Sequence, residues 1–191
     1  MQKVYSLDLS AFVNQRRYYI IVLLIATLSG ALYAVGLKDN ETLMYTINQF
    51  VTTQEHNIQL LEVFKNSLLT YTISATLIFI GGLNRNLIPV AVLSFFYTVF
   101  SYSFTVTCFL VLYGAKGIII GLLMIGLQCT LIIGSYLELA YEGVQYSVLQ
   151  QTKGIDAYSK KFVGCMLVIF GTSAIDAIIQ PLMLILIYRI L

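Results

Sequence analysis

Five long apolar stretches constrain the fold of this chain more than any other feature of its sequence. A helix rises about 1.5 Å per residue, so about 20 residues cross a hydrocarbon layer of about 30 Å. The stretches cover residues 18–37, 67–83, 87–113, 118–137 and 162–188. A spanning segment must satisfy its own backbone polar groups, as a helix does. We therefore expect an all-α integral membrane protein, with a five-transmembrane-helix bundle formed by a single domain of residues 1–191.

The composition excludes several classes of function. Of the 191 residues, 59% are hydrophobic and 10% are charged, whereas about a quarter of a typical soluble domain is charged. The net charge of +2 shows no basic patch of the kind that binds nucleic acid. The single histidine, His56, has no second His or Cys at metal-ligand spacing, and no nucleophile has a base beside it. We expect no enzyme, no cofactor, no metal ion and no nucleic-acid partner.

The basic residues of the loops predict the orientation, because cytoplasmic loops of membrane proteins carry an excess of Lys and Arg. With a cytoplasmic N-terminus and an extracytoplasmic C-terminus, seven basic residues lie inside and four outside. The inner set is Lys3, Arg16, Arg17, Arg85, Lys153, Lys160 and Lys161, and the outer set is Lys38, Lys65, Lys116 and Arg189.

Two loops are long enough to contact the lipid bilayer or other proteins. The outer loop, 38–66, has the pattern of two short amphipathic helices, which lie on a bilayer or on a partner. The apolar residues that we expect to dock a partner are Phe50, Ile58, Leu61 and Phe64. The inner loop, 138–161, is predicted to extend the fourth helix before it turns at Gly154. Its acidic face, Glu138 and Glu142, is either a solvated helix surface or a docking face for a cytoplasmic partner.

One acidic side chain, Asp176, lies near the middle of the last apolar stretch. An acid at the centre of a spanning helix costs about 2.5 to 3.5 kcal/mol on insertion scales, so it needs a partner or a purpose. Gln180 shares its helix face, and Pro181 frees the carbonyl one turn earlier. The other deep polar side chain is Gln128 in the fourth stretch. Asp176 is therefore either a proton, ion or substrate site, or a fixed contact that a hydrogen bond to Gln128 could provide.

Four features of the chain occur together: the basic pair Arg16-Arg17 before the first helix, the segment 64–69 (FKNSLL), the Ile88-Pro89 turn and the final segment 175–181 (IDAIIQP). In these features the chain resembles the stage II sporulation protein M (SpoIIM) family. Two departures are Tyr97-Thr98, where the family tends to have Lys-Gly, and Gln128, which alone remains of a Pro-Gln-Asn motif. The resemblance implies a membrane scaffold of the bacterial cell membrane. In spore formers the family assembles with peptidoglycan-degrading partners at the septum and supports engulfment.

Two functions remain open at this point. The first is a non-enzymatic scaffold whose outer loop docks cell-wall hydrolases. The alternative is a permease-like subunit of an ABC-type exporter, because relatives in non-sporulating bacteria look like components encoded beside such machinery. In that case Asp176, Gln180 and Gln128 would line a path, and the inner loop would meet an ABC ATPase. Small residues at two places would also allow a homo-oligomer: Gly117 and Gly121, and Ala26, Gly30 and Ala34.

Overall fold

The computed structural model describes residues 9–52, 60–147 and 154–190, and within these ranges the regular structure is entirely helical. Five helical stretches, within 16–36, 60–83, 85–113, 115–147 and 155–183, are long and apolar enough to cross a membrane. They fit a multi-pass membrane protein. The elements are α1 (Leu9–Gly36), α2 (Glu41–Thr52), α3 (Leu60–Leu83), η1 (Arg85–Leu87), α4 (Ile88–Tyr113), α5 (Ala115–Gly121), η2 (Leu122–Gly126), α6 (Leu127–Ser147) and α7 (Ile155–Ile190).

Two helices begin earlier than the apolar stretches predict. We expected residues 58–68 to form a separate amphipathic helix, but from Leu60 onward they are the first turns of α3. Similarly, α7 begins at Ile155 rather than at 162. No Gly or Pro separates the polar first turns from the apolar part in either helix, so nothing ends the helix at the predicted boundary. The predicted extension of the fourth helix is present, because α6 continues to Ser147.

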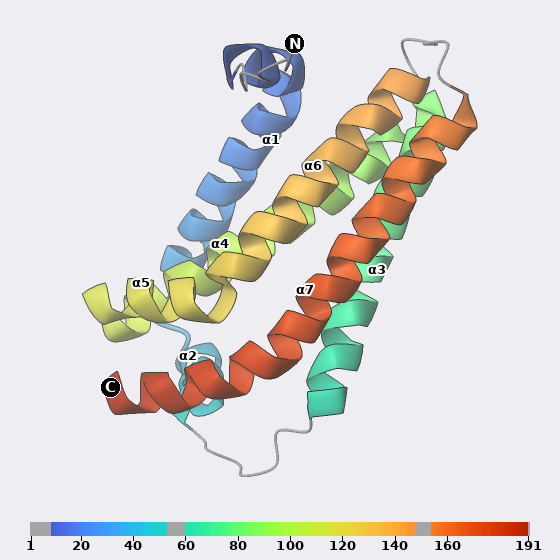
Figure 1. Cartoon of the computed structure of the whole chain (residues 1–191). Helices are drawn as coiled ribbons and strands as arrows, with labels where there is room; N and C mark the ends of the chain where they lie inside the picture. The colour runs from blue at the N-terminus through green and yellow to red at the C-terminus, as the bar shows by residue number, and fades with distance from the viewer. Residues whose placement is uncertain (1–8, 53–59, 148–153, 191) are drawn as a thin grey trace.

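The long helices run alternately up and down the bundle (Figure 1). In this view α6 and α7 lie side by side, α3 and α4 lie behind them, and the ends of the chain are at opposite ends of the bundle. α3 packs against α4, α6 and α7, while α1 packs mainly against α4.

Short turns join α3 to α4 and α4 to α5. The side chain of Asn84 accepts a hydrogen bond of 3.0 Å from the amide of Asn86 and so caps the 3₁₀ turn η1. Gly114 has a φ of +60°, in the region that favours glycine, and it ends α4 directly before α5. These turns make the flanking helices antiparallel neighbours.

Buried tyrosines connect the helices through their hydroxyl groups. Tyr136 of α6 donates to the carbonyl of Tyr71 at 2.7 Å, Tyr158 of α7 donates to the carbonyl of Phe79 at 3.0 Å, and Tyr19 of α1 donates to the carbonyl of Ala140 at 3.1 Å. A tyrosine fits an apolar interior when its hydroxyl finds such an acceptor. All three rings belong to the main apolar core.

Small residues allow the closest helix contacts. A Cβ added at Gly143 of α6 would lie 2.9 Å from the Cα atom of Gly82 in α3, so the two backbones nearly touch. On α1, the predicted small-residue face packs against α4, since a Cβ at Gly30 would lie 2.5 Å from the carbonyl oxygen of Phe100. Ala26 and Ala34 on the same face are fully buried. This face is therefore used within the chain.

The amphipathic helix α2 lies across the lower end of the bundle in Figure 1, close to the last part of α7. Its Met44 is buried in a small cluster with Ala34 and Cys108. Beyond its middle, α7 turns across this end of the bundle, and Met183 packs against the cluster of Ile120 and Met124 in the α5 region. Part of the predicted apolar face of α2 is thus covered by the chain itself.

Candidate functional site: a buried acid between three helices

Asp176 of α7 meets polar side chains of two other helices. Its side chain is 1% exposed, and the hydroxyl of Tyr71 in α3 donates a hydrogen bond of 2.9 Å to its Oδ2 atom. The same hydroxyl lies 3.3 Å from Oε1 of Gln128 in α6. The sequence predicts a contact between Gln128 and Asp176, and the structure places Tyr71 between the two.

Tyr71 has one hydroxyl proton, so it cannot donate to both neighbours at once. The shorter contact, to the carboxyl group of Asp176, is the better place for that proton, because hydrogen bonds to charged acceptors are stronger. The oxygen and nitrogen of a glutamine side chain are assigned from the hydrogen-bond network. With its amide group turned over, Gln128 donates to the oxygen of Tyr71, and the three residues form one directed chain from α6 through α3 to α7.

Three buried oxygen atoms around this chain have no hydrogen-bond partner in the described part of the protein. They are Oδ1 of Asp176, Oγ of Ser173 and the hydroxyl oxygen of Tyr102. Ser173 is fully buried one turn before Asp176 on the same face of α7. Among the side chains that the structure describes, no Lys, Arg or His forms an ion pair with Asp176. A buried polar atom without a partner is rare in a folded protein and calls for a physical reason.

Helix irregularities lie beside two residues of this chain. Gln128 is the second residue of α6 and follows η2, a π-helical turn, directly. Pro181 lies within α7 five residues after Asp176 and cannot donate to the carbonyl of Ala177. π-Helical turns occur often at functional sites, and a proline inside a helix weakens its hydrogen-bond ladder.

An open pocket of about 350 Å³ lies between α3 and α7 next to this site. Its lining includes Tyr71 and Gln180, and the remaining residues come from the first turns of α3: Val63, Asn66, Ser67 and Thr70. Five of the six lining residues carry polar groups, and none is charged. The pocket therefore lies beside Tyr71, the residue that donates a hydrogen bond to Asp176.

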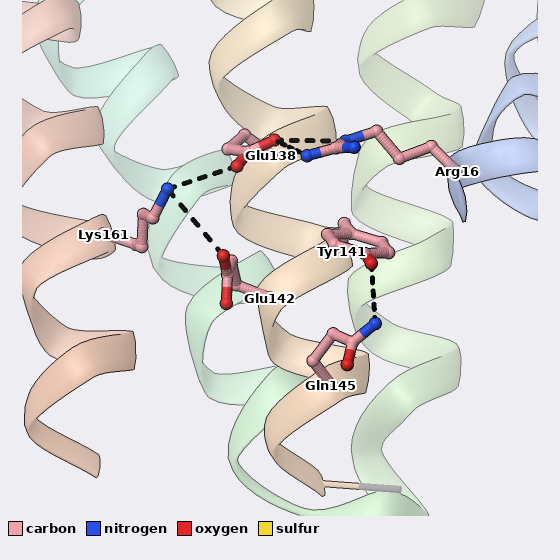
Figure 2. A network of polar contacts seen from close by, with 6 residues as sticks. All are labelled: Arg16, Glu138, Tyr141, Glu142, Gln145 and Lys161. Carbon is pink, nitrogen blue, oxygen red and sulfur yellow. Dashed lines mark hydrogen bonds and ion pairs between the residues drawn. The ribbon is translucent and has the colours of Figure 1, made fainter. Parts of the chain in front are cut away.

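A second polar network joins α1, α6 and α7 toward the opposite end of the bundle (Figure 2). Arg16 donates to Oε2 of Glu138 from Nη2 at 2.7 Å and from Nε at 3.2 Å. Lys161 contacts the other oxygen of Glu138 at 3.2 Å and lies 3.8 Å from Glu142. The guanidinium group of Arg16 also lies over the ring of Tyr141, 4.4 Å from its centre. The predicted acidic face is therefore paired within the chain.

The predicted outer docking residues lie in different environments. Leu61 is 61% exposed at the start of α3, whereas Phe64 packs edge-on against Phe170 of α7 with ring centres 5.5 Å apart. Ile58 and the side chain of Phe50 lie outside the described parts of the chain. Leu61 is thus the one predicted docking residue that the structure describes as open to a partner.

The described residues contain no group of three or more His, Cys, Asp or Glu side chains that could hold a metal ion. Comparisons of the chain with family models, with curated proteins and with solved structures gave no match.

Sequence reasoning missed Tyr71 and the role of Arg16. Tyr71 is one of 14 tyrosines, and its local sequence does not distinguish it from the others. Arg16 lies 122 positions from Glu138 in the chain and was assigned only to the basic flank of the first helix. The sequence contains one indication of the Arg16 contact. Arg16 and Glu138 are predicted at the same membrane boundary, where a basic and an acidic side chain attract each other.

Proposed function

We propose that the protein is a non-enzymatic scaffold of a bacterial cell membrane, with a cytoplasmic N-terminus and an extracytoplasmic C-terminus. Its role would resemble that of the SpoIIM family, which assembles with peptidoglycan-degrading proteins during septal remodelling and engulfment. The observation that carries this proposal is the apolar layer between the two polar networks.

That layer separates the networks along the length of the bundle. Gln128 and Glu138 are ten positions apart on α6, or about 15 Å. Between them lie Ile132 and Tyr136, both fully buried, and Ile169 of α7 is fully buried in the same core. The hydroxyl of Tyr136 within this layer donates to a backbone carbonyl of α3. Packed side chains of this kind favour a structural bundle over a channel through a single copy.

The partner surface that we propose is the exposed part of α2 and the beginning of α3. Tyr45 of α2 is 66% exposed and Leu61 of α3 is 61% exposed. Both lie at the end of the bundle that the distribution of basic residues places outside the cell, where cell-wall hydrolases act. Aromatic and aliphatic side chains that remain exposed on a packed scaffold are typical anchors for a protein partner.

Site-specific photocrosslinking in the native bacterium tests this proposal. A photoreactive residue at Tyr45 or Leu61 should capture an extracytoplasmic cell-wall hydrolase or its membrane anchor, identified by mass spectrometry. The matched control is Leu167 of α7, which is 71% exposed in the middle of a spanning helix and should capture lipid or nothing. Failure of both outer positions to capture such a partner in cells where the variants are functional would contradict the scaffold.

A second candidate is a permease-like subunit of an ABC-type exporter. It is favoured by the interrupted helices at Asp176 and Gln128, because discontinuous helices form substrate and ion sites in transporters. Asp176→Asn separates the two functions when its effect in cells is measured. A scaffold keeps its activity when the amide replaces the acid as a hydrogen-bonding group, whereas a path that uses the charge loses it. Copurification of an ABC ATPase would further favour the exporter.

A further inference from the structure

We propose that the site around Asp176 binds one monovalent alkali cation, with Oδ1 of Asp176 and Oγ of Ser173 as ligands. This inference is independent of the scaffold and exporter functions, because it rests only on the oxygen atoms around Asp176.

The charge of Asp176 has no partner among the described side chains. Asp176 is 1% exposed, and its Oδ2 atom accepts from a neutral tyrosine. A buried carboxylate is expensive unless a positive charge accompanies it. No described basic side chain forms an ion pair with Asp176, so the compensating charge has to come from a bound ion or a proton.

Two oxygen atoms of the site have no hydrogen bond within the described part of the chain. Oδ1 of Asp176 and Oγ of Ser173 belong to one face of α7, and neither forms a hydrogen bond. A proton on the carboxyl group would neutralise Asp176 but would leave Oγ of Ser173 without a partner. A small cation that contacts both oxygens satisfies both. The hydroxyl oxygen of Tyr102 also has no partner among the described residues, and the carbonyl of Ala177, next to Asp176 in α7, lacks the donor that Pro181 cannot supply.

The ligands of the site fit an ion with a single positive charge. The site has a single carboxylate, and the described residues offer no cluster of three acidic, His or Cys ligands. A divalent ion in protein is usually held by several carboxylates, whereas one carboxylate with neutral oxygen atoms balances one positive charge. An uncharged polar pocket, lined in part by Asn66, Ser67 and Tyr71, lies beside the tyrosine that contacts Asp176.

Binding of ²²Na⁺ to the purified full-length protein in detergent tests the inference, with choline chloride keeping the ionic strength constant. We expect saturable binding of one ion per chain and a thermal midpoint that rises with Na⁺. At about 100 times the dissociation constant the rise should be on the order of 5 to 10 °C. K⁺ and Li⁺ as competitors then show which alkali ion fits best.

Two variants and one control make the result specific. Asp176→Asn should abolish binding, and Ser173→Ala, which keeps the acid, should weaken it by on the order of tenfold or more. Ser94→Ala is the control, because Ser94 is a buried serine of α4 that donates to the carbonyl of Ser74. The Ser94→Ala protein should bind the ion as the wild-type protein does. Absence of saturable binding to the wild-type protein would overturn the inference, as would unchanged binding to Asp176→Asn. A midpoint that depends on pH but not on Na⁺ would assign the charge to a proton and would equally overturn it.

Discussion

Replacement of Tyr71 by phenylalanine removes one oxygen atom from the centre of the bundle and isolates Asp176. The lost hydroxyl contacts Asp176 at 2.9 Å and Gln128 at 3.3 Å. A hydrogen bond to a charged group contributes about 1.5 to 3 kcal/mol, and a neutral bond between membrane helices averages about 0.6 kcal/mol. We expect Tyr71→Phe to lower the free energy of unfolding by about 2 kcal/mol, or about 4 to 8 °C in the thermal midpoint.

Tyr136→Phe is the matched comparison. Tyr136 is a fully buried tyrosine of α6, and its hydroxyl donates to a neutral backbone carbonyl of α3 at 2.7 Å. Its replacement should cost about 0.6 to 1 kcal/mol. The two variants lose the same atom from similar surroundings, so their difference reports the effect of the acid.

Equilibrium unfolding in mixed micelles, followed by circular dichroism, measures both variants. A double-mutant cycle with Asp176→Asn should give a coupling of about 1 to 2 kcal/mol between Tyr71 and Asp176, since residues in direct contact are not additive. Equal costs for the two tyrosine replacements, together with a coupling below about 0.5 kcal/mol, would refute the reasoning that Asp176 organises this centre.

Two further predictions concern packing and charge. Gly143→Ala should destabilise the protein by about 1 to 3 kcal/mol, because the new methyl group would meet α3. Gly134→Ala on the same helix meets nothing within 4 Å and should stabilise by up to about 1 kcal/mol through helix propensity, so a similar thermal midpoint for the two variants would contradict the packing. Arg16→Leu should cost about 1 to 3 kcal/mol because Arg16 is the best-buried partner of Glu138. Glu142→Gln, which removes only a 3.8 Å contact to an exposed lysine, should cost less than about 0.5 kcal/mol. Unfolding of both variants in low and high salt measures the two losses of stability. Equal losses for Arg16→Leu and Glu142→Gln would argue against the Arg16 contact.

The number and type of the long helices could be predicted from the sequence, because hydropathy and helix length are local properties. The prediction was poorest at the helix starts. The chain is polar around Asp156, and the sequence predicts a loop there, yet Asp156 lies in the first turn of α7. Glu62, expected in a separate short helix, lies in the first turn of α3. An acidic residue in the first turn interacts well with the helix dipole, so it marks a helix start as readily as a loop.

The candidate site could be predicted only in part. Asp176 stands out because its side chain is costly in an apolar stretch. Tyr71 could not be predicted as its partner, because it reaches Asp176 from α3 only when the two helices have the rotation and depth that packing gives them. The sequence predicts a contact between Gln128 and Asp176, and the structure adds the hydroxyl of Tyr71, which contacts both residues.

The sequence by itself determined that this chain forms five apolar helices, with one acid near the middle of the last. The tertiary structure alone decided which groups surround that acid, that Glu138 pairs with Arg16 and Lys161, and that the small-residue face of α1 is covered by α4. The physical reason is the range of the interactions. Helix formation depends on residues three or four positions apart, whereas the contacts around Asp176 and Glu138 join residues up to 122 positions apart and depend on how the packed helices are turned.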